Sequence, residues 1–135
     1  MTHALTILIV DDDPDDQLQL IEAFREIDPD VVCCTAMNGQ EGLKLLEFTT
    51  PALLPSLIFL DLNMPRVNGQ RFLFELKSDD HLKAIPVVIY STSSNPKDIK
   101  DLMRLGAFDY ITKGPDSLVL KEKLTSLILS MSPKS

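Results

Sequence analysis

Residues 5–16 read Leu-Thr-Ile-Leu-Ile-Val-Asp-Asp-Asp-Pro-Asp-Asp, an apolar run that changes at Asp11 into five carboxylates within six positions. The run from Leu5 to Val10 is rich in aliphatic residues, as expected of a strand buried on both faces of a sheet. Asp13 followed by Pro14 is typical of a helix start, because the carboxylate can cap the helix and proline fits its first turn. The stretch therefore predicts a buried strand, an acidic turn and a helix.

The chain repeats this order of a short apolar run followed by an amphipathic segment. Between the apolar runs, leucine, isoleucine and phenylalanine recur with the spacing of helices that bury one face. Strands joined by helices pair in parallel, and right-handed crossovers place helices on both faces of the sheet. The sequence therefore predicts an α/β fold, a doubly wound five-stranded parallel sheet with five helices. The predicted strands are Leu5–Val10, Val31–Ala36, Leu57–Leu60, Val87–Tyr90 and Phe108–Thr112.

Length and charge narrow the class of protein. The chain has 135 residues, with 20 acidic and 13 basic side chains and a formal net charge of −7. This length suits one domain, which we expect over residues 1–135. The acidic excess argues against nucleic-acid binding, because phosphate contacts require a basic surface. The first apolar run is too short for a signal or membrane segment, so we expect a cytoplasmic protein without membrane contacts.

Two adjacent cysteines, Cys33 and Cys34, lie in the second predicted strand. Neighbouring side chains of a strand point to opposite faces, so a disulfide between them would be strained. We therefore expect both as reduced thiols in the core.

Polar side chains stand at the predicted ends of four strands. Asp11 and Asp12 follow the first strand, Asp61 the third, Ser91 the fourth and Lys113 the fifth. In a doubly wound sheet, ligands bind beyond the carboxyl ends of the strands. Any one of these residues alone would be an ordinary turn, capping or surface residue, but together they predict a single site.

Three carboxylates at one edge repel each other unless a cation neutralises them, and hard oxygen ligands favour Mg²⁺. With the metal bound, one aspartate could attack phosphorus and form an acyl phosphate. Lys113 would then neutralise phosphoryl charge, and Ser91 would donate a hydrogen bond to it. The remaining acids of the opening stretch, Asp13, Asp15 and Asp16, are expected to serve a solvated helix start.

The segment at residues 60–69, Leu-Asp-Leu-Asn-Met-Pro-Arg-Val-Asn-Gly, is specific to one family. With the acid pair, the segment Pro-Val-Val-Ile-Tyr-Ser at 86–91 and Tyr-Ile-Thr-Lys at 110–113, the chain resembles a response-regulator receiver domain. The resemblance covers roughly residues 5–129 and is to the single-domain, chemotaxis-regulator kind with a flavodoxin-like fold. It implies a single receiver domain without an output domain.

The resemblance also assigns roles to the site residues. It implies that Asp61 is the phosphoacceptor, that Asp12 binds Mg²⁺ directly and that Asp11 binds it through water. The backbone carbonyl of Asn63 would be a further metal ligand. Ser91 matches the family's phosphoryl-binding hydroxyl, and Lys113 in Tyr-Ile-Thr-Lys matches the family's lysine.

A two-component switch follows from this resemblance. A sensor histidine kinase, a phosphotransfer protein or acetyl phosphate would load Asp61, and Ser91 would move toward the phosphoryl group while Tyr110 rotates. The rate of phosphate loss would depend on Asn63 and Ser93. The signal would pass to a downstream protein of unknown identity, and family precedent allows a homodimer through the face of the fourth and fifth helices.

One position departs from the family pattern: Gly114 follows Lys113 where receivers usually have proline, and Pro115 comes one place later. We expect a trans Lys113–Gly114 peptide bond, a shifted or more mobile loop, and a less rigidly held Lys113. The Asn95-Pro96 helix start and the segment at 82–88 also resemble single-domain regulators paired with bacterial phytochrome kinases, although a light-sensing role does not follow.

Two other function classes fit the sequence less well. An aspartyl-phosphate phosphohydrolase usually has a second aspartate two residues beyond the nucleophile, where this chain has Asn63, so we do not expect an enzyme acting on an external substrate. A phosphorylation-independent scaffold would not require the complete set of acid pair, acceptor, hydroxyl and lysine. The glycine-rich motifs that bind dinucleotides or ATP are also missing from the sequence.

Overall fold

The computed structural model describes residues 5–50, 53–62, 69–92 and 95–131. Within these ranges, five strands alternate with five helices, as predicted, and each strand boundary lies within one residue of the expected one. The strands are β1 (Thr6–Val10), β2 (Val32–Ala36), β3 (Leu57–Leu60), β4 (Val87–Ser91) and β5 (Asp109–Thr112). The helices are α1 (Pro14–Ile27), α2 (Gly39–Glu47), α3 (Gly69–Ser78), α4 (Pro96–Arg104) and α5 (Ser117–Met131).

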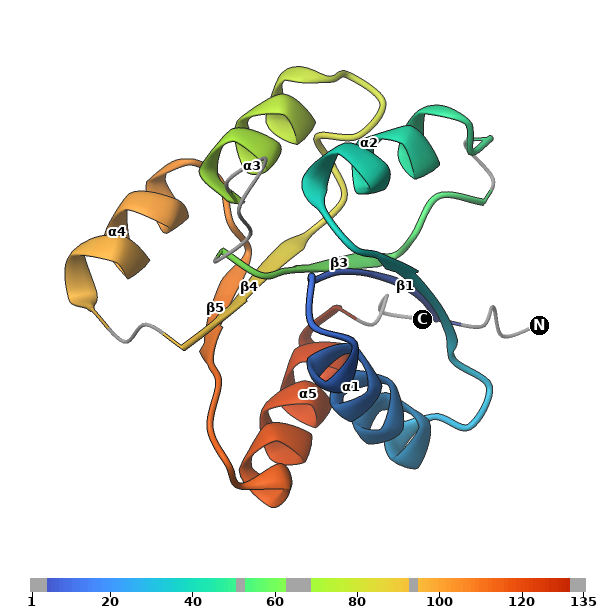
Figure 1. Cartoon of the computed structure of the whole chain (residues 1–135), viewed down its shortest axis with the longest axis vertical. Coiled ribbons are helices and arrows are strands. Elements are labelled where there is room, and N and C mark those ends of the chain that lie inside the picture. Colours follow the sequence, from blue (N-terminus) through green and yellow to red (C-terminus); the bar gives the residue numbers. More distant parts are fainter. Residues whose placement is uncertain (1–4, 51–52, 63–68, 93–94, 132–135) are drawn as a thin grey trace.

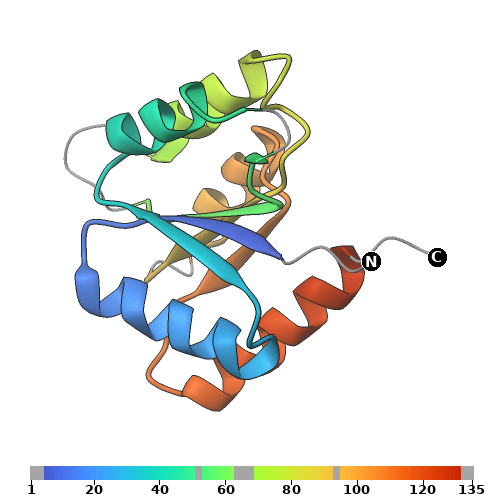
Figure 2. The ribbon, with the colours of Figure 1, turned by 90° about the vertical axis from the view of Figure 1, so that its right-hand side faces the viewer.

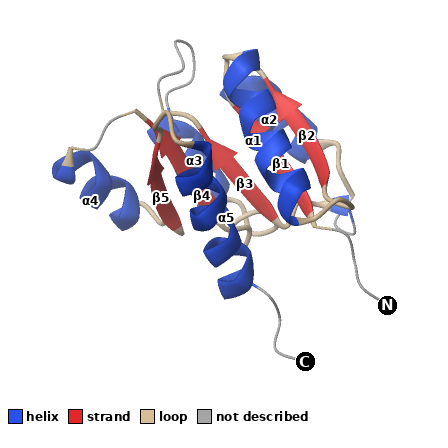
Figure 3. Cartoon of the chain, turned by 90° about the horizontal axis from the view of Figure 1, so that it is seen from below, coloured by secondary structure: helices blue, strands red, loops and turns tan. Residues whose placement is uncertain are grey.

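The strands form one parallel sheet in the order β2-β1-β3-β4-β5 (Figure 3). Helices α1 and α5 cover one face, whereas α2, α3 and α4 lie on the other (Figures 1 and 2). This three-layer arrangement is the predicted doubly wound fold. Among the described residues, none of the helices combines the length and the apolar character that a membrane span requires.

Each face of the sheet has its own core. In β1, Leu8 and Val10 pack into the cluster under α2, α3 and α4, while Ile7 and Ile9 pack into the cluster under α1 and α5. This split follows from the alternation of side chains along a strand. Because β1, β3 and β4 are internal and buried on both faces, they read as continuous apolar runs, and their polar residues appear only where the strands end.

The edge strand β2 departs from this pattern. Val32 is 48% exposed, Cys33 is half-buried and Cys34 is exposed. The expectation of a core position is therefore wrong for Cys34, whereas Cys33 packs against the core under α1 and α5, and both are free thiols. The sequence pattern did not distinguish an edge strand, which has one neighbour and incomplete helix cover, from the internal strands that resemble it.

The start of α1 is fixed by two polar side chains. The Asp13 carboxylate caps the helix by accepting a hydrogen bond from the backbone N–H of Asp15 at 2.9 Å. The buried side chain of Gln17 donates through Nε2 to the carbonyl oxygens of Asp11, at 2.6 Å, and Ala36, at 3.3 Å. Gln17 therefore joins α1 to the ends of two neighbouring strands.

Replacing Gln17 tests this link. We expect Gln17→Met, which preserves much of the volume, to lower the free energy of unfolding by about 1–3 kcal/mol, because the carbonyl groups of Asp11 and Ala36 both lose a buried hydrogen bond, although that of Ala36 keeps the Asp11 N–H. The control Gln19→Met, in the same helix but in a more exposed position, should change stability by less than about 0.5 kcal/mol. Urea denaturation measures both, and equal effects of the two substitutions would contradict the structural role of Gln17.

Candidate functional site

Backbone hydrogen bonds bring the predicted site residues to one edge of the sheet. The N–H of Asp61 donates to the carbonyl of Val10 at 2.9 Å, and the N–H of Lys113 donates to the carbonyl of Ser91 at 2.7 Å. The parallel pairing thus continues one residue beyond β3 and β5. Asp11 is fixed in the same way, because its N–H donates to Ala36 at 3.0 Å.

Three carboxylates meet at this edge. One carboxylate oxygen from each of Asp11, Asp12 and Asp61 lies within 4.8 Å of the other two. Asp11 and Asp61 are 1% and 4% exposed, and Asp12 is exposed. The predicted grouping of these three acids is confirmed. Two buried carboxylates beside an accessible third make a donor set of hard oxygens, which suits a divalent cation such as Mg²⁺.

Lys113 is the cationic member of the group. Its Nζ lies 3.2 Å from Asp11 Oδ2, 2.7 Å from Asp16 Oδ2 and 3.7 Å from Asp61 Oδ1. The predicted association of Lys113 with the acid site is therefore confirmed. The expected role of Asp16 as only a solvated helix-start residue is wrong, because its carboxylate lies nearest to the ammonium. The reason is the helical turn after Pro14, which points Asp16 toward β5.

The electrostatics of the cluster follow from burial and from these contacts. Burial raises the pKa of Asp11 to about 6, with a smaller increase from the Asp61 charge; the Asp13 backbone N–H and Lys113 oppose the increase. For Lys113, burial disfavours the charged form, but the hydrogen bond to Asp16 and the negative charges of Asp11, Asp61 and Asp16 outweigh it and raise its pKa. The three carboxylates of the cluster thus share the single positive charge of Lys113 with Asp16.

Ser91 ends β4 and is fully buried. Because Leu60 of β3 pairs with Ile89 of β4, Asp61, directly after β3, and Ser91, the last residue of β4, lie at the same edge. Tyr110 pairs with Ile89 from the other side and is half-buried against the core under α2, α3 and α4. Both predicted residues therefore lie on the strands next to the acid cluster.

Sequence reasoning missed Tyr90 as well as Asp16. Tyr90 is 2% exposed, and Lys113 Nζ lies 5.2 Å from the centroid of its ring. The ring packs edge-on against Phe59, with centroids 6.1 Å apart. The electron-rich face of the Tyr90 ring attracts the Lys113 ammonium through a cation–π interaction. The only signal in the sequence was the position of Tyr90 directly before Ser91.

The Lys113–Gly114 peptide bond is trans, as expected. Lys113 is nevertheless held at both ends, by its backbone hydrogen bond to Ser91 and by its ammonium contacts. The greater mobility of the following loop stays a prediction. Asn63 and Ser93, expected to bind metal or to tune phosphate loss, lie outside the described residues.

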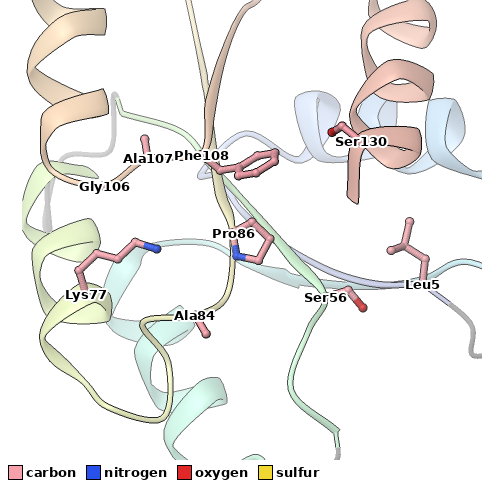
Figure 4. Close-up of a pocket in the computed structure, with 9 residues that line it drawn as sticks. All are labelled: Leu5, Ser56, Lys77, Ala84, Pro86, Gly106, Ala107, Phe108 and Ser130. Carbon is pink, nitrogen blue, oxygen red and sulfur yellow. The ribbon is translucent and has the colours of Figure 1, made fainter. Parts of the chain in front are cut away.

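A separate pocket of about 650 Å³ lies at the opposite edge of the sheet (Figure 4). It is lined by residues that precede strands, including Ser56, Pro86 and Phe108. Lys77 Nζ donates there to the carbonyl oxygens of Lys83 and Ile85, at 3.0 and 3.3 Å. None of the described residues that line this pocket carries a carboxylate, so they offer none of the chemistry of the acid cluster.

Comparison with known proteins agrees with this geometry. Residues 7–125 match the response regulator receiver domain. The chain belongs to this family. The receiver therefore shares a fold and an acidic site with two-component response regulators, and proteins of this family bind divalent metal at such acid clusters and accept phosphoryl groups from histidine kinases or phosphotransfer proteins.

Two solved structures illustrate the likeness. The phosphorylated cyanobacterial phytochrome response regulator RcpA is 33% identical, with a TM-score of 0.84 over 97% of this chain and 98% of that one. The Mn²⁺-bound response regulator Rcp1 is 27% identical, with a TM-score of 0.81 over 97% of each chain. These neighbours are single-domain regulators, as the sequence resemblance implied.

Among curated proteins, PilH of Pseudomonas aeruginosa is 31% identical over 122 residues, which are 90% of this receiver and 96% of PilH. Several other curated relatives are longer, and some are named methylesterases. The receiver spans between 25% and 47% of the length of these relatives. The likeness to them therefore concerns one region of each.

The raised pKa of Asp11 gives a test in metal-free protein. Between pH values of about 4 and 6, the folded state binds more protons than the unfolded state, so ionisation of Asp11 lowers the free energy of unfolding as pH rises. We expect Asp11→Asn to become more stable relative to wild type across this window, by about 1–3 kcal/mol at pH 7.

Urea denaturation in the presence of a chelator measures this difference, with the exposed neighbour Asp12→Asn as the control. A stability difference between wild type and Asp11→Asn that stays constant between about pH 4 and pH 7, or that changes in the opposite direction, would contradict the account.

Proposed function

We propose that this receiver is a phosphorylation-activated switch of a two-component system, with Asp61 as the phosphoacceptor. One observation carries the proposal: the buried Asp61 carboxylate shares an edge with two further acids within 4.8 Å and has an ammonium 3.7 Å from its Oδ1. This arrangement supplies a nucleophile, a cation site and a fixed positive charge, the parts that phosphoryl transfer requires.

The metal site of the proposal consists of Asp11, Asp12, Asp61 and the backbone carbonyl of Asn63. The described members of this set fit Mg²⁺, because they offer only carboxylate oxygens and because exposed Asp12 leaves one side open to water. Mg²⁺ bound there would offset the charge of an incoming phosphoryl group and lessen its repulsion by the acids. The Mn²⁺-bound state of Rcp1 supports this assignment.

Asp61 acts as the nucleophile. One of its carboxylate oxygens attacks phosphorus, the P–N bond of the donor's phosphohistidine breaks, and the imidazole leaves with the electron pair. With acetyl phosphate, a P–O bond breaks instead and acetate leaves. Lys113 supplies positive charge beside the transferred group, and Ser91 donates its hydroxyl proton in a hydrogen bond to a phosphoryl oxygen.

Conformational change follows from this new hydrogen bond. Movement of Ser91 toward the phosphoryl group frees space next to β5, and Tyr110 rotates into it. The surface of α4, β5 and α5 is thereby altered, which signals the phosphorylated state to a downstream protein. Asn63 and Ser93 tune the later attack of water on the acyl phosphate.

Residues 1–135 are proposed to act as a single receiver domain that is not an enzyme for external substrates. It works in the cytoplasm, receives its phosphoryl group from a sensor histidine kinase or a phosphotransfer protein, and signals through protein contacts rather than through nucleic acid or membrane. A homodimer would use the α4–α5 face.

The phosphoacceptor is tested with acetyl phosphate and intact-mass spectrometry. Wild-type protein should gain one phosphoryl group in the presence of Mg²⁺ and none with a chelator, and Asp61→Asn should gain none because the amide is not nucleophilic. Asp30→Asn, an exposed aspartate in the loop between α1 and β2, should label like wild type. Equal labelling of wild type and Asp61→Asn would reject Asp61 as the acceptor.

A further inference from the structure

The shortest contact of the Lys113 ammonium is with an acid outside the proposed metal site. Lys113 Nζ lies 2.7 Å from Asp16 Oδ2, but 3.7 Å from Asp61 Oδ1, which is beyond hydrogen-bond distance. The ammonium is therefore bonded to α1 and to Asp11 and stands back from the proposed phosphoacceptor.

Asp16 is held in this position by the first turn of α1. The cap at Asp13 fixes the turn, since the Gln17 backbone N–H donates to the Asp13 carbonyl at 3.1 Å. The Gln17 side chain then ties the same turn to the end of β1 at the Asp11 carbonyl. These hydrogen bonds therefore hold the Asp16 carboxylate next to the Lys113 ammonium.

Asp16 differs from the other two partners of Lys113 in its surroundings. Asp11 and Asp61 belong to the group of described acids whose oxygens lie close enough to share one ion, and Asp16 does not. A cation in that group would reduce the attraction of Asp11 and Asp61 for the ammonium. The attraction of Asp16, which is 30% exposed against 12% for Lys113, would remain.

We propose that Asp16 is a positioning residue that holds Lys113 in the unphosphorylated receiver and competes with the phosphoryl group for it. This inference rests on the proposed function at Asp61. A phosphoryl group on Asp61, whose Oδ1 lies 3.7 Å from the ammonium, brings further anionic oxygens close to Lys113. Lys113 then exchanges its hydrogen bond to Asp16 for one to a phosphoryl oxygen, with no covalent bond made or broken.

Beryllofluoride, a mimic of the phosphoryl group on a carboxylate, tests the competition. Its affinity at saturating Mg²⁺ is measured by calorimetry for wild type, Asp16→Asn and Asp15→Asn. Asp15 is the matched control, because it lies in the same first turn of α1, one residue before Asp16, and its side chain is exposed. The substitution Asp15→Asn removes the same charge. We expect Asp16→Asn to bind beryllofluoride about threefold or more tightly, and Asp15→Asn to bind like wild type.

The alternatives give different results. A merely structural role of Asp16 would weaken binding of both Mg²⁺ and beryllofluoride, and it would overturn the inference, as would unchanged affinity. Equal tightening in Asp15→Asn would overturn it too, by assigning the effect to overall charge. If wild type does not bind beryllofluoride, the proposed function itself fails. Asp16→Ala provides a second variant, and thermal unfolding checks that each protein is folded.

Discussion

The site of this receiver depends on the attraction between the Lys113 ammonium and the carboxylates that surround it. The parallel sheet delivers Asp11 and Asp61 to one edge, where both are nearly fully buried, and the mutual repulsion of two such charges must be offset. Lys113 does so from the end of β5, anchored by its backbone to Ser91 and by its side chain to Asp11 and Asp16. This compensation is incomplete, because the single charge of Lys113 faces two buried carboxylates. Burial, more than the Asp61 charge, keeps the pKa of Asp11 raised.

The incomplete compensation links structure to function. A site with more buried negative charge than one lysine neutralises favours a second cation, and the opening beside exposed Asp12 allows one to enter. Lys113 can bind an incoming anion only if its ammonium gives up a hydrogen bond to one of its present partners, Asp11 or Asp16. Folding and the proposed signalling therefore use the same residues: Asp11, whose ionisation destabilises the metal-free domain, belongs to the acid cluster that the proposed reaction requires.

Most of the fold was predictable from sequence, because internal parallel strands are continuous apolar runs and their polar residues mark the strand ends. For the same reason the acid cluster and Lys113 were found at the right edge. The exposure of Cys34 was not, since the order of apolar runs along the chain does not specify which strand lies at the edge of the sheet. Asp16 and Tyr90 were missed because their contacts with Lys113 join residues far apart in the chain, and they depend on helix orientation and strand register, which apolar periodicity does not specify.

A crystal structure of the receiver with Mg²⁺ and beryllofluoride tests the central claim directly, because it locates the cation, the phosphoryl mimic and the ammonium together. The account predicts Mg²⁺ among Asp11, Asp12 and Asp61, beryllofluoride on an Asp61 carboxylate oxygen, and Lys113 Nζ hydrogen-bonded to fluoride at about 3 Å and no longer to Asp16. Beryllofluoride bound away from Asp61, or a Lys113 ammonium that keeps its bond to Asp16 and makes none to fluoride, would contradict it.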